Sequence, residues 1–485
     1  MLAYELSHQL GTWSVGPGSL QRKLAKALAD CIRKGVIHAG VRLPSERSLA
    51  RALSISRTTV VAAFEALKEN GWVESRIGSG TWVCESSPEV ASERAAALSA
   101  SPVLNLLNQR HDGDIVDYSL GSPLPLRELP MDLLTLPPGE YGPLIHDHHY
   151  YPLGLPSARQ AVADHFCKAG VPTRPEEVLI TNGAQHALTL CTSLYVQRGD
   201  SVLVEDPGFF GALDAFRVAG ARISPLPVEA DGVPMGILRD RIVASSARLV
   251  YLTPTFQNPT GAVMPISMRK EVARIASELG TPIVDDEVLA ELVLDGPTPP
   301  LIASYAPTAA ILTIGSLSKL ACPGLRIGWV RAPEPVIEQL ARIRSAGDLG
   351  SPTINQAIVV RLFGAVDQLR LLRRGQLRPR RDLMAELLQA SLPHWTFRLP
   401  AGGLFFWIKL PAGDSREFAQ VALRHGVLIL PGPAMSATEN HSRFIRLPFL
   451  AEEEDLQKGV RRLAAAWRDY QSAGAPGRPA TVSMV

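Results

Sequence analysis

The stretch Thr313-Ile-Gly-Ser-Leu-Ser-Lys-Leu-Ala-Cys-Pro-Gly-Leu-Arg-Ile-Gly-Trp329 decides the fold, and Lys319 stands at its centre. The apolar run Ala310–Ile314 predicts a buried strand, and the glycine and serines after it predict a turn. Such a turn lifts Lys319 off the carboxyl end of the strand, where open α/β sheets bind their ligands. Arg326 follows closely, and a lysine held near another cation loses pKa and can form a Schiff base with a carbonyl group. An exposed surface lysine is the alternative for this motif alone.

Short apolar runs separated by helical stretches continue the α/β pattern along the chain. Seven of them predict the strands of a doubly wound sheet: Val178–Thr181, Val202–Glu205, Arg222–Ser224, Leu249–Leu252, Pro282–Asp285, Ile311–Ile314 and Ile327–Val330. A long helical region follows, from about Pro333 to Leu392. Four later runs predict the strands of a smaller α+β domain: Trp395–Leu399, Leu404–Ile408, Val427–Leu430 and Phe444–Leu447.

Length and composition limit the class of protein. A chain of 485 residues is too long for one compact core, so two or more domains are expected. No apolar run reaches the length of a membrane span and the N-terminus lacks the pattern of a signal peptide, so we expect a cytoplasmic location and no membrane partner. Five scattered cysteines without a C-x-x-C spacing indicate reduced thiols rather than disulfides or a zinc site.

Residues 1–84 are basic, which favours an anionic polymer as their partner. They carry eleven Lys and Arg residues against six Asp and Glu residues, which gives +5, and the rest sums to −3 because the whole chain is +2. Apolar residues at helical spacing predict a helix from Leu20 to about Arg33, a second one capped by Ser45 and a third one capped by Ser56. The short join between the last two predicts a helix-turn-helix.

Two short strands follow the helices and flank the glycine-rich turn Arg76–Gly80, which predicts a wing. The motifs Val41–Ala50, Ser56–Val60, Ala66–Trp72 and Gly78–Thr81, in this order, resemble the winged helix of GntR-superfamily repressors. The resemblance implies that double-stranded operator DNA is bound by Arg47, Ser56, Arg57, Thr58, Thr59 and Gly78. A solvated helix residue in some other small bundle is the alternative for Arg57.

Composition separates this winged helix from the body. Fifteen of the eighteen residues from Glu85 to Pro102 are Ala, Ser, Glu or Pro, which predicts a linker over 85–114. We expect the body over 115–470, its small subdomain at roughly 375–470, and a loose tail over 471–485.

Four further segments could hold a phosphorylated, aromatic, carbonyl-bearing cofactor. Thr181–His186 joins a strand to a helix, whose free N–H groups and dipole attract a phosphate. Phe209 offers a flat face to a ring, and Asn258 could bond a ring hydroxyl. Asp286 ends a strand, where a carboxylate could keep a ring nitrogen protonated. Singly, a glycine turn, a core phenylalanine, a plain turn and a solvated acidic loop are the alternatives.

Together with Lys319, these segments resemble a fold-type I aminotransferase over residues 115–468, and the combination with the winged helix resembles the MocR group of GntR-type regulators. The resemblance implies pyridoxal 5'-phosphate joined to Lys319, with Asp286 at the pyridine nitrogen, Asn258 at the ring hydroxyl and Phe209 stacked on the ring. It also implies that Arg446 binds the carboxylate of a substrate or effector. Around the phosphate it implies Gly183, Ala184, Gln185, Ser316, Ser318 and Arg326.

Three positions depart from the family pattern. Leu289 stands where a tyrosine usually bonds the ring hydroxyl, and Ala184 stands where a hydroxyl-bearing residue is common. Whether His149, Tyr150 or Tyr151 reaches the cofactor of a neighbouring subunit is open. The cluster His146–His149 also raises a metal site, but consecutive loop residues rarely give tetrahedral geometry, so no metal is expected.

The leading hypothesis is a homodimeric transcriptional regulator that senses an amine or amino acid through the cofactor. A working aminotransferase with a vestigial winged helix is one alternative, and a DNA-binding protein whose body only dimerises is another. The intact run Arg57–Thr59 argues against a vestigial winged helix, and Lys319 with Asp286 argues against a silent body. Leu289 mildly disfavours efficient transamination.

Overall fold

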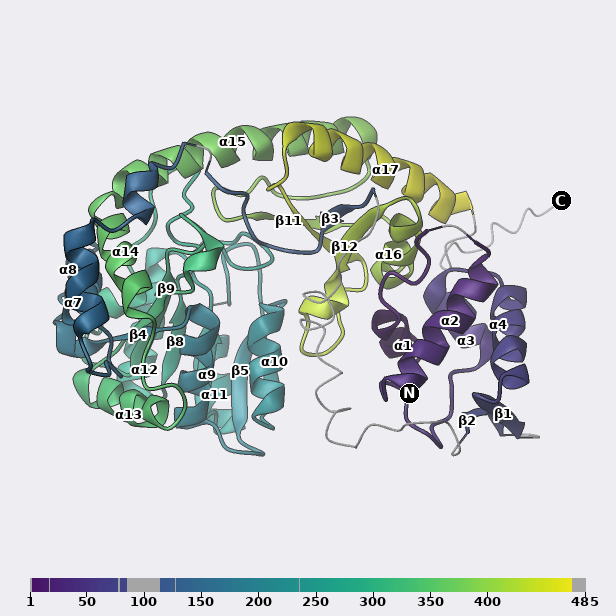
Figure 1. Ribbon diagram of the computed structural model, residues 1–485, viewed down its shortest axis with the longest axis horizontal. Coiled ribbons are helices and arrows are strands. Elements are labelled where there is room, and N and C mark those ends of the chain that lie inside the picture. Colours follow the sequence, from purple (N-terminus) through teal and green to yellow (C-terminus); the bar gives the residue numbers. More distant parts are fainter. Residues whose placement is uncertain are drawn as a thin grey trace.

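The computed structural model describes residues 2–16, 18–76, 79–84, 114–126, 128–234 and 236–472. It consists of a winged helix, a small domain and a large domain, with the small domain in the middle (Figure 1). The predicted linker, apart from its last residue, and the predicted tail, apart from its first two, lie outside the described residues. Within these ranges no helix is both long and apolar enough to cross a membrane.

The N-terminal part contains the three predicted helices and the two strands of the wing. Ser45 Oγ accepts a hydrogen bond from Ser48 N, and Ser56 Oγ accepts one from Thr59 N, so both predicted helix caps are confirmed. The wing strands pair antiparallel. The elements are α1 (Ala3–Gln9), α2 (Leu20–Arg33), α3 (Glu46–Leu53), α4 (Arg57–Glu69), β1 (Val73–Arg76) and β2 (Gly80–Val83).

Helix α1 is absent from the sequence prediction. It is short, and its cap residue Leu2 offers no side-chain hydrogen bond, so its own sequence gives a weak helical signal. The helix is held by tertiary packing, because Leu6, Leu10 and Trp13 are buried in one core with Leu24.

All seven predicted strands form the sheet of the large domain, in the order β4-β10-β9-β8-β7-β5-β6. Strand β10 is antiparallel to β4 and β9, and the remaining neighbours are parallel. Parallel strands are covered on both faces, which accounts for their continuous apolar runs. The bounds are β4 (Val178–Thr181), β5 (Ser201–Asp206), β6 (Arg222–Pro227), β7 (Leu249–Leu252), β8 (Ile283–Asp286), β9 (Ile311–Ser316) and β10 (Gly328–Arg331).

Helices cover the two faces of this sheet, as a doubly wound α/β fold requires. They are α7 (Pro138–His146), α8 (Pro156–Lys168), α9 (Ala184–Tyr195), α10 (Phe210–Val218), α11 (Ile237–Ser245), α12 (Ile266–Leu279), α13 (Glu334–Ser345) and α14 (Thr353–Gly364). The long helix α15 (Val366–Ser391) crosses from the large domain to the small one (Figure 1). Short 3-10 turns occupy Met131–Leu134, Pro175–Glu177, Ile302–Ser304, Pro323–Leu325 and Gly432–Met435.

The small domain has a sheet of order β11-β13-β12-β3, in which only the β12–β3 pair is parallel. Three of the four predicted strands are confirmed. The strand predicted at Trp395–Leu399 is wrong, because only Thr396 bridges to Lys409 and Trp395 packs edge-on against Phe418. The edge strand β3 comes from before the large domain and is not predicted. The elements are β3 (Val116–Tyr118), β11 (Phe405–Lys409), α16 (Ser415–Arg424), β12 (Val427–Pro431), β13 (Phe444–Pro448) and α17 (Glu453–Ser472).

Candidate functional site

Lys319 lies in the turn just beyond β9, as the sequence predicts. Its Nζ donates a hydrogen bond to the carbonyl oxygen of Gly121, 2.7 Å away. Burial, together with the positive charges of Arg446 and Arg326, lowers the pKa of Lys319 to about 8. A neutral amine is therefore accessible near neutral pH, and the neutral amine is the form that attacks a carbonyl carbon.

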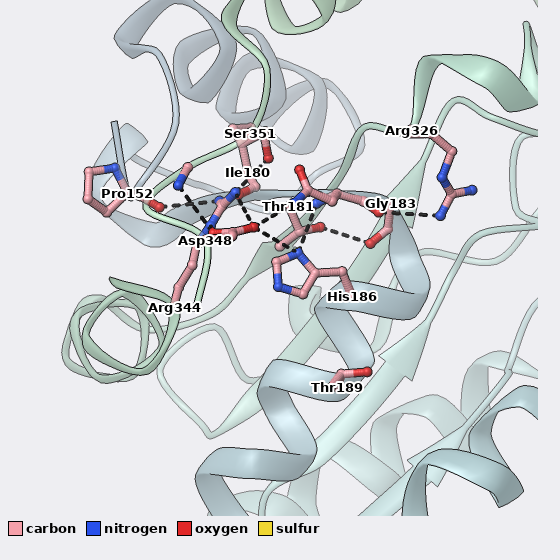
Figure 2. A network of polar contacts seen from close by, with 12 residues as sticks. Pro152, Ile180, Thr181, Gly183, His186, Thr189, Arg326, Arg344, Asp348 and Ser351 are labelled. Atoms are coloured by element: carbon pink, nitrogen blue, oxygen red, sulfur yellow. Dashed lines mark hydrogen bonds and ion pairs between the residues drawn. The ribbon is translucent and has the colours of Figure 1, made fainter. Parts of the chain in front are cut away.

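The turn from β4 into α9 forms a cradle for an anion. Gly183 has φ +87°, and a Cβ at this position would lie 2.7 Å from Arg326 Nη2. Arg326 Nη2 donates to the carbonyl oxygen of Asn182 at 3.3 Å, so the guanidinium lies across the turn; Figure 2 shows it beside Gly183. The first N–H groups of α9, from Ala184 onward, lack partners within the helix and carry the positive end of its dipole. The cradle fits a phosphate and leaves no room for a side chain at Gly183.

The two serines at the end of β9 lie beside this cradle. Ser316 Oγ donates to the carbonyl oxygen of Ile327 at 2.7 Å, and it accepts from Ser318 N at 3.2 Å. A Cβ on Gly328, in the neighbouring strand, would lie 2.7 Å from Ala184 N. The ends of β9 and β10 are therefore packed directly against the first turn of α9.

A polar network supports the cradle from behind (Figure 2), and sequence reasoning missed it. Asp348 accepts from Asn182 Nδ2, and its other oxygen accepts from Arg344 Nε at 2.8 Å. The Arg344 side chain is fully buried. It also donates to the carbonyl oxygens of Pro152 and Ile180 and to Ser351 Oγ. The one signal in the sequence is the i,i+4 spacing of Arg344 and Asp348, which is common on helix surfaces.

Asp286 lies at the end of β8 and is buried. Its Oδ2 accepts from the hydroxyl of Tyr251 at 2.6 Å, and its Oδ1 accepts from Val288 N at 3.1 Å. Burial raises the pKa of Asp286, while the two hydrogen bonds act in the opposite direction. Sequence reasoning did not identify Tyr251, although a tyrosine within an apolar strand needs a partner for its hydroxyl. Leu289 is buried in the apolar core and has no polar group, so it cannot make the hydrogen bond that the family's tyrosine makes to the ring hydroxyl.

The loop that carries Asn258 is fixed by Arg269, which sequence reasoning also missed. The Arg269 side chain is fully buried. It donates to the carbonyl oxygens of Pro254 and Met264, to Thr255 Oγ1 and to Glu287 Oε1. One buried guanidinium therefore joins the Asn258 loop to the end of β8, where Asp286 lies.

Arg446 connects the small domain to the large one. It lies on β13 and is 1% exposed. Its Nη1 donates to Asn258 Oδ1 at 3.2 Å, and its Nη2 donates to the carbonyl oxygen of Ser119. The guanidinium stacks over the Phe405 ring, with 4.1 Å to the centroid, and lies 5.5 Å from that of Phe210. Burial lowers the pKa of Arg446 to about 9, and its Nε has no hydrogen-bond partner among the described residues, so this guanidinium can accept an anion as a further partner.

Phe209 and Gln185 meet at the start of α10. Gln185 Nε2 donates to the carbonyl oxygen of Gly211 at 2.8 Å. A Cβ on Gly211 would lie 2.5 Å from the Phe209 ring and 2.8 Å from Gln185 Oε1. An amine, an anion cradle, a buried acid, an amide and a flat ring thus gather at the carboxyl edge of the sheet, and this set fits a phosphorylated aromatic aldehyde.

The His146–His149 segment follows α7. The side chains of Asp147, His148 and His149 bring ligand atoms within 4.8 Å of one another. Asp147 already accepts hydrogen bonds from His149 Nδ1 and the hydroxyl of Tyr151. Tyr150 is 75% exposed.

Most of the predicted DNA-facing residues are exposed on the winged helix. Ser56, Arg57, Thr58 and Arg47 are exposed and Thr59 is partly buried. Arg57 Nη2 forms an ion pair with Glu46 at 2.9 Å, which is a surface contact of low energy. Gly78 lies outside the described residues.

Comparison with known families matches the chain in two parts. The family "Aminotransferase class I and II" matches residues 146–463. The family "Bacterial regulatory proteins, gntR family" matches residues 20–83.

Three similar proteins cover different shares of the chain. The uncharacterized HTH-type transcriptional regulator YdfD of Bacillus subtilis is 30% identical over 93% of this chain and 97% of its own length. The probable rhizopine catabolism regulatory protein MocR of Rhizobium meliloti is 29% identical over 67% of this chain and 68% of its own. The crystal structure of LysN, an alpha-aminoadipate aminotransferase of Thermus thermophilus complexed with N-(5'-phosphopyridoxyl)-L-leucine, is 28% identical, with a TM-score of 0.69 over 79% of this chain and 98% of that one.

Proposed function

Because this chain belongs to the MocR type, in which a GntR-type domain is fused to a class I and II aminotransferase domain, we propose that it regulates transcription in response to an amine or amino acid bound at a pyridoxal phosphate site. One observation carries the proposal. A lysine of lowered pKa lies beside an anion cradle, in a chain whose recognition-helix residues are exposed.

Different residues of the large domain would bind the phosphate and the aldehyde of the cofactor. Gly183, Ala184 and Gln185 receive the phosphate on the first turn of α9, and the side chains of Ser316, Ser318 and Arg326 complete the cradle. When bound, pyridoxal phosphate supplies an electrophilic aldehyde and an electron-withdrawing ring. Lys319 provides the amine that attaches to it.

The remaining residues orient the ring and exclude water. Asp286 would accept a hydrogen bond from the protonated ring nitrogen, and the hydroxyl of Tyr251 holds the Asp286 carboxylate in place. The amide of Asn258 would hydrogen-bond the ring hydroxyl, and Phe209 would cover one ring face. An ion pair of Asp286 with a protonated ring is favoured because its site is buried, where a charge without a partner is costly.

The winged helix binds double-stranded DNA by inserting the start of α4 into the major groove. Ser56, Arg57, Thr58 and Thr59 occupy this start, and Arg47 lies on the preceding helix. The wing, formed by β1 and β2, would lie along the minor groove. Two copies of the chain in a dimer would present two such helices to a symmetric operator.

The small ligand is expected to carry an acid group next to its amine. The buried Arg446 guanidinium offers a planar pair of donors for a carboxylate. It lies near enough to Lys319 for its charge to lower the pKa of the lysine. The amine of an amino acid can therefore bind beside Lys319 while its carboxylate binds Arg446.

A working aminotransferase is the second candidate, and the presence of both Lys319 and Arg446 in one buried site favours it. The two functions separate in one titration of the cofactor-loaded chain with L-leucine, L-2-aminoadipate and simple amines. A regulator changes its visible absorption and its DNA affinity at the same ligand concentration. Turnover of the amino acid to its keto acid, with DNA affinity unchanged by every ligand that alters the absorption, would favour the enzyme instead.

A further inference from the structure

The winged helix is docked on the small domain through α1 and the end of α3. These two helices meet α16, beside α17 (Figure 1). Arg57 and Thr58, in the first turn of α4, remain exposed beside this docking face, whereas Ser56 lines the cleft between the winged helix and α16. Docking therefore orients the recognition helix without covering it.

A single carboxylate lies at the centre of this interface. Glu417, on α16, is 2% exposed. Its Oε1 accepts from the hydroxyl of Tyr4 at 2.8 Å and from Arg51 Nε at 2.9 Å, both on the winged helix. Its Oε2 accepts from the hydroxyl of Tyr470, on α17, at 3.0 Å. A buried carboxylate is stable only with such partners, so undocking the winged helix would remove two of its three donors.

The end of α3 makes a second set of polar contacts with α16. Arg424 donates to the carbonyl oxygens of Leu53 and Ser54, where the negative end of the α3 dipole lies. Ser54 Oγ donates to the carbonyl oxygen of Glu417 at 3.1 Å. The guanidinium of Arg416 lies 3.9 Å from the centroid of the Tyr4 ring. Both ends of α16 therefore contact the winged helix through paired donors and acceptors.

The same unit of the small domain carries Arg446. Helix α16 leads directly into β12, and β12 pairs with β13 so that Leu430 lies opposite Arg446. Arg446 in turn donates to Asn258 of the large domain. A carboxylate that binds Arg446 competes with this bond, and it therefore changes how the small domain rests on the large one.

We propose that the Glu417 latch, made of Glu417, Tyr4, Arg51, Ser54, Arg424 and Tyr470, fixes the winged helix to the small domain and transmits ligand binding at Arg446 to the DNA-binding helix. The inference rests on the proposed function for its ligand and its DNA, but the docking itself is independent of both. The small domain and the winged helix move as one body while the latch is closed. A ligand then alters the geometry of two recognition helices in a dimer, to which half-site spacing is sensitive.

Docking is tested first by amide hydrogen exchange on the full-length chain. Two variants open the latch with little change of shape, Glu417→Gln and Tyr4→Phe, and Glu278→Gln removes an exposed carboxylate paired with Arg239 and Arg274 as a matched control. We expect exchange in α1 and at the end of α3 to accelerate about tenfold or more in both latch variants, because a charged hydrogen bond is lost. Equal exchange in the wild type, the control and both latch variants would show that the winged helix is not held this way.

Transmission is tested with duplexes selected from a random-sequence library by the wild-type chain. The probe ligands are L-leucine and L-2-aminoadipate, added to the cofactor-loaded protein. An allosteric coupling changes DNA affinity on the order of 5- to 150-fold. In the latch variants we expect the ligand to change DNA affinity by about twofold or less, while the ligand-induced change of absorption persists. A full ligand response in a variant whose α1 exchanges rapidly would overturn the latch.

Failure of the proposed function gives a different pattern. If the wild-type chain selects no DNA, or binds it equally with and without ligands that alter the absorption, the regulator hypothesis fails and transmission through the latch fails with it. The exchange measurements still decide whether Glu417 docks the winged helix.

Discussion

The lowered pKa of Lys319 predicts a steep pH dependence for attachment of the cofactor. At pH 7 an amine with a pKa of about 8 is about 10% neutral, whereas one at the ordinary 10.5 is about 0.03% neutral, a difference of roughly 300-fold. The sign follows from the cause: burial and the nearby arginines disfavour the charged form, so the neutral amine appears at lower pH. The attachment rate should rise about tenfold per pH unit below pH 8 and level off above it.

The measurement mixes cofactor-free protein with pyridoxal phosphate over a pH series and follows the visible absorption of the attached cofactor. Borohydride reduction and peptide mapping then identify the modified lysine. Arg446→Gln removes one of the two cations, so its rate profile should move to higher pH, because the pKa of Lys319 rises. Lys319→Ala should remain colourless or hold the cofactor only loosely.

Two results would refute the pKa argument, and a third would refute the choice of lysine. A rate that is independent of pH between 6 and 8 would mean that deprotonation of Lys319 does not limit attachment. A profile that still rises steeply up to the ordinary lysine pKa would mean that burial and the two arginines do not act on the amine in solution. A pyridoxyl group mapped to another lysine would contradict the site itself.

Three further predictions concern separate parts of the chain. Arg57→Ala should lower the affinity for selected DNA by about 1–3 kcal/mol with the cofactor absorption unchanged, and full affinity at physiological salt would contradict a recognition role. Arg446→Ala should keep the cofactor and basal DNA binding yet lose the response to amino acids, as measured by DNA titration with and without ligand; a retained response would remove Arg446 from the effector site. Gly183→Ala should destabilise the cofactor-free protein by about 1–3 kcal/mol in a denaturant titration, because a φ of +87° is strained for a residue with a Cβ and the new methyl group also displaces the end of the Arg326 side chain; an unchanged midpoint would exclude that strain.

Much of the fold could be predicted because the strands of a parallel sheet are short, apolar and separated by helices. Strands β4 to β8 of the large domain follow this rule, whereas β9 and β10 are predicted from their apolar runs alone, since no α-helix separates them from each other or from β8 within the described residues 283–331. Strand β6 shows the limit of the rule, since the prediction stops three residues before the strand ends at Pro227. The rule fails where stability comes from elsewhere. Strand β3 is a brief edge strand that depends on its pairing with β12, and Trp395 has a strand-like sequence but packs into an aromatic cluster instead.

The candidate site divides in the same way. The residues predicted to touch a ligand stand in short motifs around turns, where glycine, proline and charge leave a visible pattern, as at Gly183 and Lys319. Residues that hold those turns do not. Arg344 donates to backbone carbonyls far away in sequence, and Arg269 donates to those of the loop that precedes its helix. Only the folded chain decides which carbonyls lie within reach.

The short segment after β3 has a consequence for exchanging DNA-binding modules between regulators of this type. The carbonyl oxygen of Ser119 accepts from Arg446 and that of Gly121 accepts from Lys319, and Gly121 also lies against the Phe405 ring beneath Arg446. This backbone belongs chemically to the cofactor site although it precedes the large domain by many residues. A hybrid protein should therefore be joined upstream of Asp114. A junction placed beyond Gly121 would replace the segment whose carbonyl oxygens accept hydrogen bonds from Lys319 and Arg446.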